Sequence, residues 1–320
     1  MMVLKTSFSD TLEYYIPEGI NLSELSQSDF PRIAKDERII NSICDSIKQV
    51  PTNHRIILGD SRRMKEEEVH LVVTSPPYWT LKRYDDIEGQ LGIIEDYERF
   101  LEELDKVWIK CFNALIPGGR LVVVVGDVCL ARRKYGRHRI MPLHASIQEH
   151  CRKIGFDLLT PIIWYKITNA SLEASGGRFF GKPYESNCII KNDIEYILFM
   201  RKPGGYRTPD TLMRVLSIIP EKEHHEFFQQ IWTMNGAPTK NHPAPYPLEL
   251  AERIVRMFSF VGDTVLDPFL GTGTTLLAAE KWGRNGVGYE IDPNYVKEAY
   301  KRLNENFGTR GSRIDLIGID

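Results

Sequence analysis

Residues 265–275 read Val-Leu-Asp-Pro-Phe-Leu-Gly-Thr-Gly-Thr-Thr, and this stretch decides the fold. The run Thr-Val-Leu at 264–266 predicts a buried strand. Gly271 and Gly273 predict a tight turn, because glycine tolerates unusual backbone angles and lets a ligand approach closely. A helix is expected at 274–282, and the free N–H groups at its start suit an anionic group. This order of strand, turn and helix predicts a ligand site at the end of a strand.

Two carboxylates flank the glycine turn. Asp267 ends the predicted strand, and Glu290 lies 23 residues further on, after a second predicted strand at 286–289. A dinucleotide-type fold places an acid there to bind a ribose diol. The lysine of a phosphate-binding P-loop and the third glycine of an NAD fingerprint are both missing. Because carboxylates repel a pyrophosphate but suit an ammonium group or ribose hydroxyls, we expect a nucleoside ligand without a phosphate chain.

The alternation of strands and helices continues along the chain. Five consecutive apolar residues at 121–125 indicate a strand buried on both faces, as in a parallel sheet. Strand, helix and strand between 71 and 125 form a βαβ unit, which predicts an α/β fold with a mostly parallel sheet flanked by helices. We expect further strands at 55–58, 71–73, 158–165 and 196–200, and helices at 33–50, 97–115, 143–155, 247–258 and 294–306.

These elements divide the chain into four parts. Residues 1–52 form an N-terminal extension without recognisable chemistry, and residues 53–165 form the first half of the α/β domain. The pattern breaks at 166–239, where glycines, prolines, lone charges and aromatics predict an irregular inserted region. Regular texture returns in residues 240–320, the half that contains the glycine turn.

A second informative stretch is Thr-Ser-Pro-Pro-Tyr-Trp at 74–79, directly after a predicted strand. Pro76 and Pro77 cannot donate backbone hydrogen bonds, so they end any sheet ladder at this point. A rigid, donor-poor loop that carries Ser75 and two aromatics is poor packing material, and a functional role is the better explanation. For Tyr78 and Trp79 the alternative interpretation is packing in the core.

The bulk composition excludes several classes of protein. With 320 residues, 42% of them hydrophobic and 26% charged, the chain is typical of a soluble globular protein. It lacks a bilayer-spanning apolar run and the apolar core of a secretion signal, which predicts a cytoplasmic location. The five scattered cysteines form no Cys-x-x-Cys pair, so we expect reduced thiols. No metal site is expected either, since His224 and His225 have no further ligand at metal spacing.

Charge is distributed unevenly, although the net charge is only −2. The run Arg-Arg-Lys-Tyr-Gly-Arg-His-Arg at 132–139 holds five fixed positive charges and no acid. Such a run is either a solvated surface loop or a loop that contacts phosphates, since lysine and arginine displace counterions from a polyanion.

Five motifs together resemble the amino-methyltransferases that act on DNA bases. TSPPYW at 74–79 resembles their catalytic motif, and DPFLGTGTT at 267–275 resembles their S-adenosylmethionine motif. GYEID at 288–292 is similar to the ribose-binding motif, and HPAPYP at 242–247 to the segment that lines the methionine end of the pocket. GD at 59–60 matches the acid that contacts the cofactor's adenine. The catalytic motif comes first, as in the permuted β group of this family, and the motifs span most of residues 54–307.

The resemblance implies a Rossmann-like class I methyltransferase fold, S-adenosylmethionine as cofactor and no metal. It implies that residues 166–239 form an inserted target-recognition region. The implied catalytic residues are Ser75, Pro76, Pro77 and Tyr78, and the implied cofactor-binding residues are Asp60, Thr74, His242, Asp267, Phe269, Gly271, Gly273, Thr274 and Glu290.

The resemblance also suggests the reaction. Ser75 followed by Pro-Pro-Tyr resembles the form typical of N4-cytosine methylation, with N6-adenine as the runner-up and an RNA or protein glutamine as more distant alternatives. A non-catalytic module would have lost the loop or the glycines. We expect the Ser75 side chain and the Pro76 carbonyl each to accept a hydrogen bond from one N–H group of the target amine. The base must be turned out of the duplex, and Tyr78 would stack on it.

The implied partner is double-stranded DNA. The expected DNA-binding residues are Trp79, Arg132, Arg133, Lys134, Arg137 and Arg139. A cognate restriction endonuclease is the expected functional partner of a modification enzyme, without a requirement for physical association. Relatives of this group often dimerise, while the sequence itself is silent on the oligomeric state. No membrane partner is expected.

Overall fold

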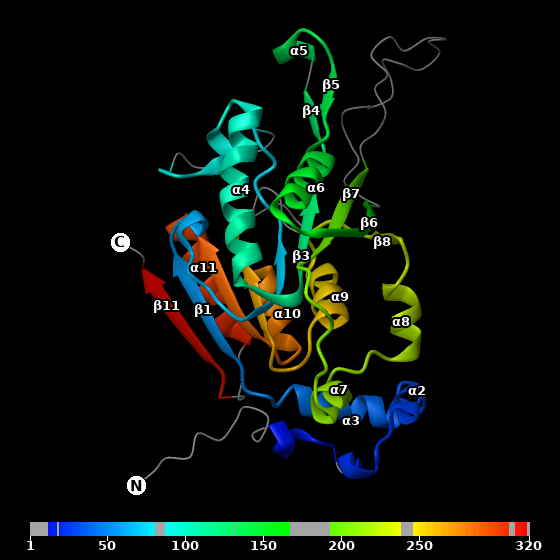
Figure 1. The fold of residues 1–320 in the computed structure, drawn as a ribbon. Helices are drawn as coiled ribbons and strands as arrows, with labels where there is room; N and C mark the ends of the chain where they lie inside the picture. The colour runs from blue at the N-terminus through cyan, green and yellow to red at the C-terminus, as the bar shows by residue number, and fades with distance from the viewer. Residues whose placement is uncertain are drawn as a thin grey trace, which may run out of the picture.

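The computed structural model describes residues 12–17, 19–80, 87–130, 132–166, 193–237, 246–306 and 311–318. Its central feature is a nine-stranded sheet with the order β11-β1-β10-β9-β2-β3-β7-β6-β8 (Figure 1). Adjacent strands from β11 to β3 pair in parallel, whereas β7 is antiparallel to both of its neighbours. The prediction of a mostly parallel α/β sheet is therefore confirmed.

The strands expected at 55–58, 71–73, 264–266 and 286–289 are found within two residues of those bounds. The strand expected at 121–125 begins earlier, at Leu115, and the parallel strand at 313–318 is not predicted. In sheet order, the strands are β11 (Arg313–Gly318), β1 (Asn53–Leu58), β10 (Asn285–Glu290), β9 (Thr264–Asp267), β2 (Val69–Thr74), β3 (Leu115–Val125), β7 (Ile194–Arg201), β6 (Asp157–Lys166) and β8 (Ile231–Met234). A separate hairpin joins β4 (Val128–Leu130) to β5 (Arg139–Met141), with the short helix α5 (Arg132–Tyr135) between them.

Helices cover both faces of the sheet (Figure 1). On one face, α4 (Tyr97–Ala114) and α6 (Leu143–Ile154) form a core with alternate strand residues such as Val72 and Val123. On the other face, α9 (Leu248–Phe258) and α10 (Thr274–Lys281) pack on Leu71 and Val122. Helix α11 (Pro293–Asn306) extends this second layer beside β1. Burial on both faces explains the unbroken apolar runs of the strands.

The N-terminal extension is more structured than expected. Instead of one helix at 33–50 there are two, α2 (Phe30–Ile33) and α3 (Glu37–Ile47). The chain breaks between them because the Asp36 side chain accepts hydrogen bonds from the N–H groups of Arg38 and Ile39, which starts a new helix. Short 3-10 helices lie nearby or in later loops: η1 (Glu13–Tyr15), η2 (Leu22–Glu24), η3 (Gln27–Asp29), η4 (Ser61–Arg63) and η5 (Leu91–Ile93).

Residues 193–237 are more regular than expected for the region 166–239, in which the sequence predicts only the strand at 196–200. That segment contributes β7 and β8 to the central sheet, together with α7 (Thr211–Leu216) and α8 (Glu221–Phe227). Its lone charges and glycines lie at the ends of short elements, which masked the underlying regularity. Residues 167–192 and 238–245 lie outside the described residues.

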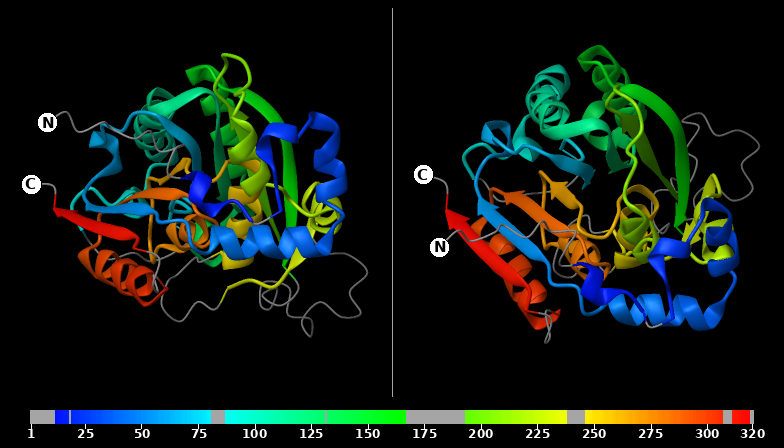
Figure 2. Two further views of the ribbon diagram at one scale, coloured as in Figure 1. Left: turned by 90° about the horizontal axis from the view of Figure 1, so that it is seen from below. Right: turned by 60° about the horizontal axis from the view of Figure 1, so that its bottom comes forward.

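Figure 2 shows the N-terminal helices, in blue, beside the yellow-green helices of this segment. Helix α3 packs on α7 through a separate apolar cluster that includes Ile43 and Val215. The N–H of Glu221 also donates to the carbonyl of Ala34 at 3.0 Å. Among the described helices, none combines the length and apolar character that crossing a membrane requires.

Candidate active site

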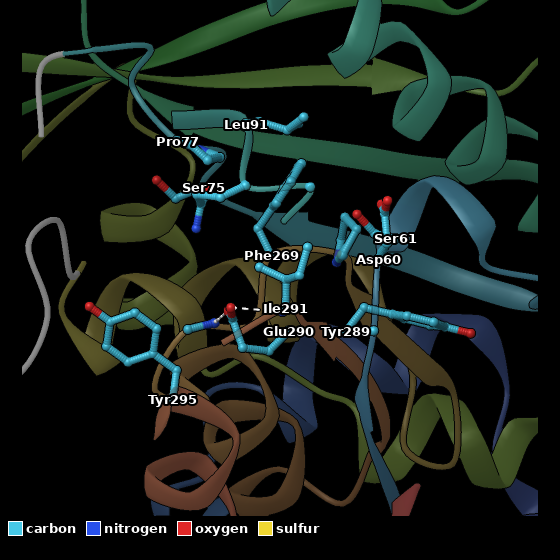
Figure 3. Close-up of a pocket in the computed structure, with 15 residues that line it drawn as sticks. Asp60, Ser61, Ser75, Pro77, Leu91, Phe269, Tyr289, Glu290, Ile291 and Tyr295 are labelled. Carbon is cyan, nitrogen blue, oxygen red and sulfur yellow. Dashed lines mark hydrogen bonds between the residues drawn. The ribbon is translucent and has the colours of Figure 1, made fainter. Parts of the chain in front are cut away.

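The principal pocket lies at the carboxyl ends of four neighbouring parallel strands (Figure 3). The segments that follow β1, β10, β9 and β2 line it, and it encloses about 580 Å³ of free space including its mouth. Strand β9 leads into α10 on one face of the sheet, and β2 leads toward α4 on the other. The pocket therefore lies where the chain direction across the sheet reverses, the usual position of a ligand crevice in open α/β sheets.

The two turns singled out in the sequence share this pocket. Ser75 and Pro77 come from the loop after β2, while Phe269 and Gly271 come from the glycine turn after β9. In Figure 3, Ser75 and Pro77 lie above Phe269, and Glu290 lies below it. A catalytic loop and a cofactor turn must meet in one cavity for direct group transfer, and this geometry satisfies that requirement.

Six of the expected catalytic and cofactor residues line the pocket: Asp60, Ser75, Pro77, Phe269, Gly271 and Glu290. Six further expected residues are buried and lie outside the lining: Thr74, Pro76, Tyr78, Asp267, Gly273 and Thr274. His242 lies outside the described residues, so the structure does not place it.

The glycine turn needs both glycines. Gly271 has a φ of 51° and Gly273 a φ of 83°, the left-handed region that glycine adopts without strain. A Cβ on Gly273 would also lie 3.1 Å from the Ala299 Cβ of α11. Gly271 lets its N–H point to the Glu290 carboxylate, with 2.7 Å between N and Oε2. The turn is thereby locked between α10, α11 and the end of β10.

Glu290 is a carboxylate held almost entirely by backbone donors. Besides Gly271, the N–H groups of Ile291 and Asp292 each donate to its Oε1 at 2.9 Å. Burial nevertheless raises the pKa of Glu290 to about 7, since desolvation outweighs these bonds. Such a carboxylate has fixed lone pairs at the pocket wall and suits hydroxyl donors such as those of a ribose.

Asp267 ties the two turns together from behind the pocket. Its side chain is only 1% exposed and accepts hydrogen bonds from Thr74 Oγ1 at 2.7 Å, Thr275 Oγ1 at 2.5 Å and the Phe269 N–H at 3.0 Å. Burial raises its pKa to about 6. Thr74 immediately precedes the Ser-Pro-Pro-Tyr loop, so one carboxylate fixes both loops relative to each other. Asp267 and Thr74 therefore act here as positioning residues and do not line the pocket.

Tyr78 belongs to a polar network next to Ser75. Ser75 Oγ donates to the Tyr78 hydroxyl at 3.4 Å, and that hydroxyl donates to Glu195 Oε2 at 3.0 Å. Glu195, at the start of β7, also forms an ion pair with Lys166. The Tyr78 ring is 5% exposed, so a base can stack on it only after the groups that cover the ring move.

Trp79, an expected DNA-binding residue, is positioned for packing in the core, the alternative that the sequence leaves open for it. Its side chain is 6% exposed and meets Tyr97 edge to face, with ring centroids 5.1 Å apart. A φ of 46° turns the backbone at this residue and directs the indole into the core beneath α4. The indole ring is therefore not available to DNA in this arrangement.

The sequence does not predict several of the residues that line the pocket. Gln90 and Leu91 reach the pocket from the connection between the catalytic loop and α4, and Tyr295 reaches it from the start of α11. None of these positions follows a strand directly, so strand-end reasoning could not find them. Glu195, which contacts Tyr78 behind the pocket, could have been found from the sequence, because it is a lone acid within the otherwise apolar β7 segment.

Asp60 lies in the lining but is already paired. Arg62 donates to both carboxylate oxygens of Asp60, with 2.9 Å between Nε and Oδ1 and 2.7 Å between Nη2 and Oδ2, and it also pairs with Glu103. Asp60 additionally caps η4 by accepting from the N–H of Arg62. The acid is thus held rigidly at the end of β1.

The basic run forms the tip of the β4–β5 hairpin. Its five cationic side chains are exposed: Arg132, Arg133, Lys134, Arg137 and Arg139. The hairpin follows the carboxyl end of β3, so it projects from the same edge of the sheet as the pocket (Figure 1). The run is therefore positioned to contact a polyanion that approaches the pocket.

Comparisons with known proteins agree with this geometry. The sequence profile of the DNA methylase family of N6 and N4 methyltransferases matches residues 69–301. Type II methyltransferase M.MjaI of Methanocaldococcus jannaschii is 36% identical over 300 residues, which cover 83% of this chain and 95% of the relative. DNA adenine methyltransferase YhdJ of Escherichia coli is 27% identical over 268 residues, covering 78% of this chain and 81% of YhdJ.

Solved structures show the same fold. TTHA0409 of Thermus thermophilus, in complex with S-adenosyl-L-methionine, is 51% identical with a TM-score of 0.69, and the match covers 83% of this chain and 99% of TTHA0409. The cytosine-N4-specific PvuII DNA methyltransferase has a TM-score of 0.59 over 84% of this chain and 96% of its own. It is 20% identical, so it supports the fold alone.

The fold and pocket define a Rossmann-like class I methyltransferase that uses S-adenosylmethionine. The chain belongs to the DNA methylase family. The pocket suits this cofactor chemically. The described lining contains the carboxylates Asp60 and Glu290 and no lysine or arginine. S-adenosylmethionine carries a sulfonium, an ammonium group and a ribose but no phosphate. A pocket lined by carboxylates therefore suits it, because carboxylates attract its positive charges and would repel a phosphate.

Proposed function

We propose that this protein methylates the exocyclic N4 amino group of cytosine in duplex DNA, after the base has been turned out of the helix. The observation that carries the proposal is that the Ser-Pro-Pro-Tyr loop and the glycine turn line one pocket. Ser75 at the first position of the loop supports cytosine over adenine, because adenine enzymes of this group more often carry Asp or Asn there.

The residues of the loop have distinct roles in this proposal. An exocyclic amine is a poor nucleophile, since its lone pair is delocalised into the ring. Ser75 Oγ and the Pro76 carbonyl each accept a hydrogen bond from one N–H group of the amine. These two hydrogen bonds favour a pyramidal nitrogen with a free lone pair. The bound cofactor supplies an activated methyl group on sulfur. The rings of Pro76 and Pro77 keep the carbonyl fixed, so little reorganisation is needed.

Base recognition belongs to Tyr78 and its neighbours. The ring would stack on the flipped base, a contact worth about 1–3 kcal/mol, similar to the few kcal/mol that flipping costs. Because Glu195 holds the Tyr78 hydroxyl, the ring already has a fixed orientation before the base arrives. We infer that entry of the base displaces the groups that now cover the ring.

N6-adenine methylation is the second candidate. It is supported by the 27% identity to a relative named as a DNA adenine methyltransferase, which spans 78% of this chain. Both bases present an exocyclic amine next to a ring nitrogen, so the same pair of acceptors would serve either one.

The proposal extends to the DNA and to the biological context. Residues 166–239 remain the proposed target-recognition region. The basic tip of the β4–β5 hairpin is proposed to contact the phosphate backbone of the DNA. The similarity to the type II methyltransferase M.MjaI supports a role in restriction and modification, with a restriction endonuclease as functional partner. We also propose a homodimer, because relatives of the β group of amino-methyltransferases often dimerise.

Expression in a bacterium that lacks DNA methylation, followed by sequencing of modified bases, tests the assignment. We expect N4-methylcytosine at one short recognition sequence. The Ser75→Ala variant is the matched control, and it should leave the DNA nearly unmodified. N6-methyladenine alone would transfer the assignment to the second candidate. DNA without modification at either base would reject the proposed activity.

A further inference from the structure

A second pocket lies at the opposite edge of the sheet, where the strands begin. We call it the basal pocket, and it encloses about 1570 Å³ of free space including its mouth. His70 near the start of β2 and Arg120 in β3 form its floor. Helix α2, the segment at 206–219 and the loop before β9 form its walls. Figure 2 shows α2 beside the segment that carries α7 and α8 at this end of the molecule.

The basal pocket is strongly cationic. Its described lining includes four arginines and two histidines but no aspartate or glutamate: Arg120, Arg207, Arg214, Arg256, His70 and His224. Arg207 is paired with Asp263 and Arg256 with Glu223, both outside the lining. Arg120 and Arg214 form no ion pair with any described carboxylate, which leaves two positive charges without a counter-charge.

Each of the two unpaired guanidinium groups lies over an aromatic ring. Arg214 lies over the Phe30 ring at 4.2 Å, and Arg120 lies over the Phe258 ring at 5.2 Å. A ring that covers the face of a guanidinium leaves its N–H edge free, the edge that binds phosphate in bidentate fashion. The Nε of Arg120 is buried and has no hydrogen-bond partner within the described structure. Burial and the neighbouring Arg201 lower the pKa of Arg120, in keeping with a cation that lacks a counter-charge.

The pocket also offers an aromatic surface at its mouth. Tyr206 lines the pocket and is 81% exposed; Arg201 lies over one face of its ring, 5.8 Å from the centroid, so a planar group would stack on the other face. Without the open space at its mouth the pocket has a volume of about 690 Å³, within the roughly 300–1,000 Å³ of a pocket for a drug-sized ligand. Both features fit a ligand larger than inorganic phosphate, with a ring as well as negative charge.

The basal pocket is separate from the site of methyl transfer. His70 and Ser75 lie five residues apart on β2 and its following loop, which places the two pockets about 16 Å apart at ~3.3 Å per strand residue. They also face opposite edges of the sheet. A duplex whose target base reaches Ser75 therefore cannot place the same segment in the basal pocket.

We propose that the basal pocket binds a small nucleoside phosphate, with its phosphates on Arg120 and Arg214 and its base against Tyr206. The site is independent of the cofactor pocket, whose described lining is acidic and lacks lysine and arginine. The proposal does not depend on which base the enzyme methylates.

Calorimetry with ATP on the full-length protein tests the proposal, with S-adenosylhomocysteine present in saturating amount to block the cofactor pocket. We expect one ATP per chain in the wild type. The variants Arg120→Gln and Arg214→Gln should each bind about tenfold more weakly, since each removes a charged hydrogen bond. Arg152→Gln, an exposed arginine on α6, is the matched control and should bind like the wild type. Pyrophosphate should bind more weakly than ATP because it lacks the base.

Photolabelling of the wild type with 8-azido-ATP gives a reading that does not depend on the folding of any variant. Label on peptides containing Tyr206 or residues 257–260 supports the proposal. Three outcomes would overturn it: no ATP or pyrophosphate binding at millimolar concentration, equal loss in the Arg152 control, or label confined to other peptides. Displacement of ATP by a short duplex would also overturn the proposal, since the pocket would then bind DNA rather than a free nucleotide.

Discussion

Asp267 shows at the residue scale how a side chain outside the pocket can govern it. Its carboxylate is bonded to Thr74, Thr275 and the Phe269 backbone, and so connects the loop after β2 with the turn after β9. The sequence marks this acid as a ligand-binding residue, whereas the structure places it one layer behind. The functional consequence is the same, because both turns lose their common anchor if the carboxylate is removed.

Asp267→Ala should therefore lower both stability and cofactor affinity. The substitution leaves three buried donors unpaired, at about 1–3 kcal/mol each, so we expect the free energy of unfolding to fall by at least about 3 kcal/mol. Binding of S-adenosylmethionine should disappear in calorimetry. Asp267→Asn is the control, since it keeps the size and one acceptor oxygen, and its loss should be smaller. Wild-type affinity in the alanine variant would contradict the anchoring role.

Glu290 makes cofactor binding depend on pH. Burial raises its pKa to about 7 in the folded chain, above the ordinary value of 4.5, so the folded state favours the protonated form. The contribution of Glu290 to the free energy of unfolding therefore falls as pH rises from about 4.5 to about 7. Ribose hydroxyls, in contrast, donate to the ionised carboxylate. We expect the affinity for S-adenosylmethionine to rise between pH 6 and 8, by at most about tenfold per pH unit.

Titration calorimetry at several pH values measures this effect, with Glu290→Gln as the matched variant. Glutamine cannot ionise, so its affinity should be low and nearly constant over the same range. Any contribution from Asp267, whose pKa is about 6, is common to both proteins. Parallel pH profiles for the two proteins would assign the dependence to another group.

The glycine turn is the decisive unit at the scale of elements. It joins β9 to α10, and its conformation is set by two positive φ angles and by the approach of α11. The backbone angle and the contact are separate constraints, and Gly273 meets both. Gly136, in the basic hairpin, has a similar φ of 74° but no atom within 4 Å of the position that a Cβ would occupy.

This difference allows backbone strain and crowding to be measured separately. Gly136→Ala should cost only the strain of a positive φ, about 1–3 kcal/mol. Gly273→Ala adds overpacking against Ala299 and Leu303, whose side chains would lie 3.1 Å from the new Cβ, and should cost about 1–3 kcal/mol more. Urea denaturation of both variants gives the difference. Equal losses would mean that α11 adjusts freely and that the turn needs glycine for its φ alone.

The whole molecule was partly predictable from its sequence, and the reasons differ by region. The parallel half of the sheet follows from apolar runs such as 121–125, because a strand buried on both faces needs no partner information to be recognised. The strand expected at 196–200 is found as β7, whereas β8 is not predicted, since its parallel pairing with β6 joins segments far apart in the chain. The N-terminal helices were read as one, because their break depends on the cap that Asp36 provides.

The candidate site divides in the same way. Residues that follow strands directly, such as Ser75, Phe269 and Glu290, were expected and line the pocket. Gln90 and Tyr295 were missed because tertiary packing alone carries them there. Trp79 was the ambiguous case, and only its φ of 46° and its contact with Tyr97 decide for the core. Local sequence thus defines the strand ends, and the connections complete the pocket.

Charge is separated across the whole molecule, with an acidic cofactor pocket beside an exposed basic hairpin at one edge of the sheet. If the hairpin grips DNA, replacing Arg132, Arg133 and Lys134 by glutamine should weaken binding of all sequences alike. Each phosphate contact contributes about 0.9 to the slope of log affinity against log salt, so the slope should shrink by up to about 2.7. Fluorescence anisotropy with duplex DNA at several salt concentrations measures it.

A triple variant of equal charge change separates local contact from net charge. Lys222, Lys297 and Lys301 are exposed on α8 and α11, away from the hairpin, and their replacement by glutamine should leave the slope nearly unchanged. Cofactor affinity should be preserved in both triple variants, since the described lining of the cofactor pocket contains no lysine or arginine. If both variants reduce the slope equally, the hairpin is an ordinary solvated surface and the DNA is held by other cations.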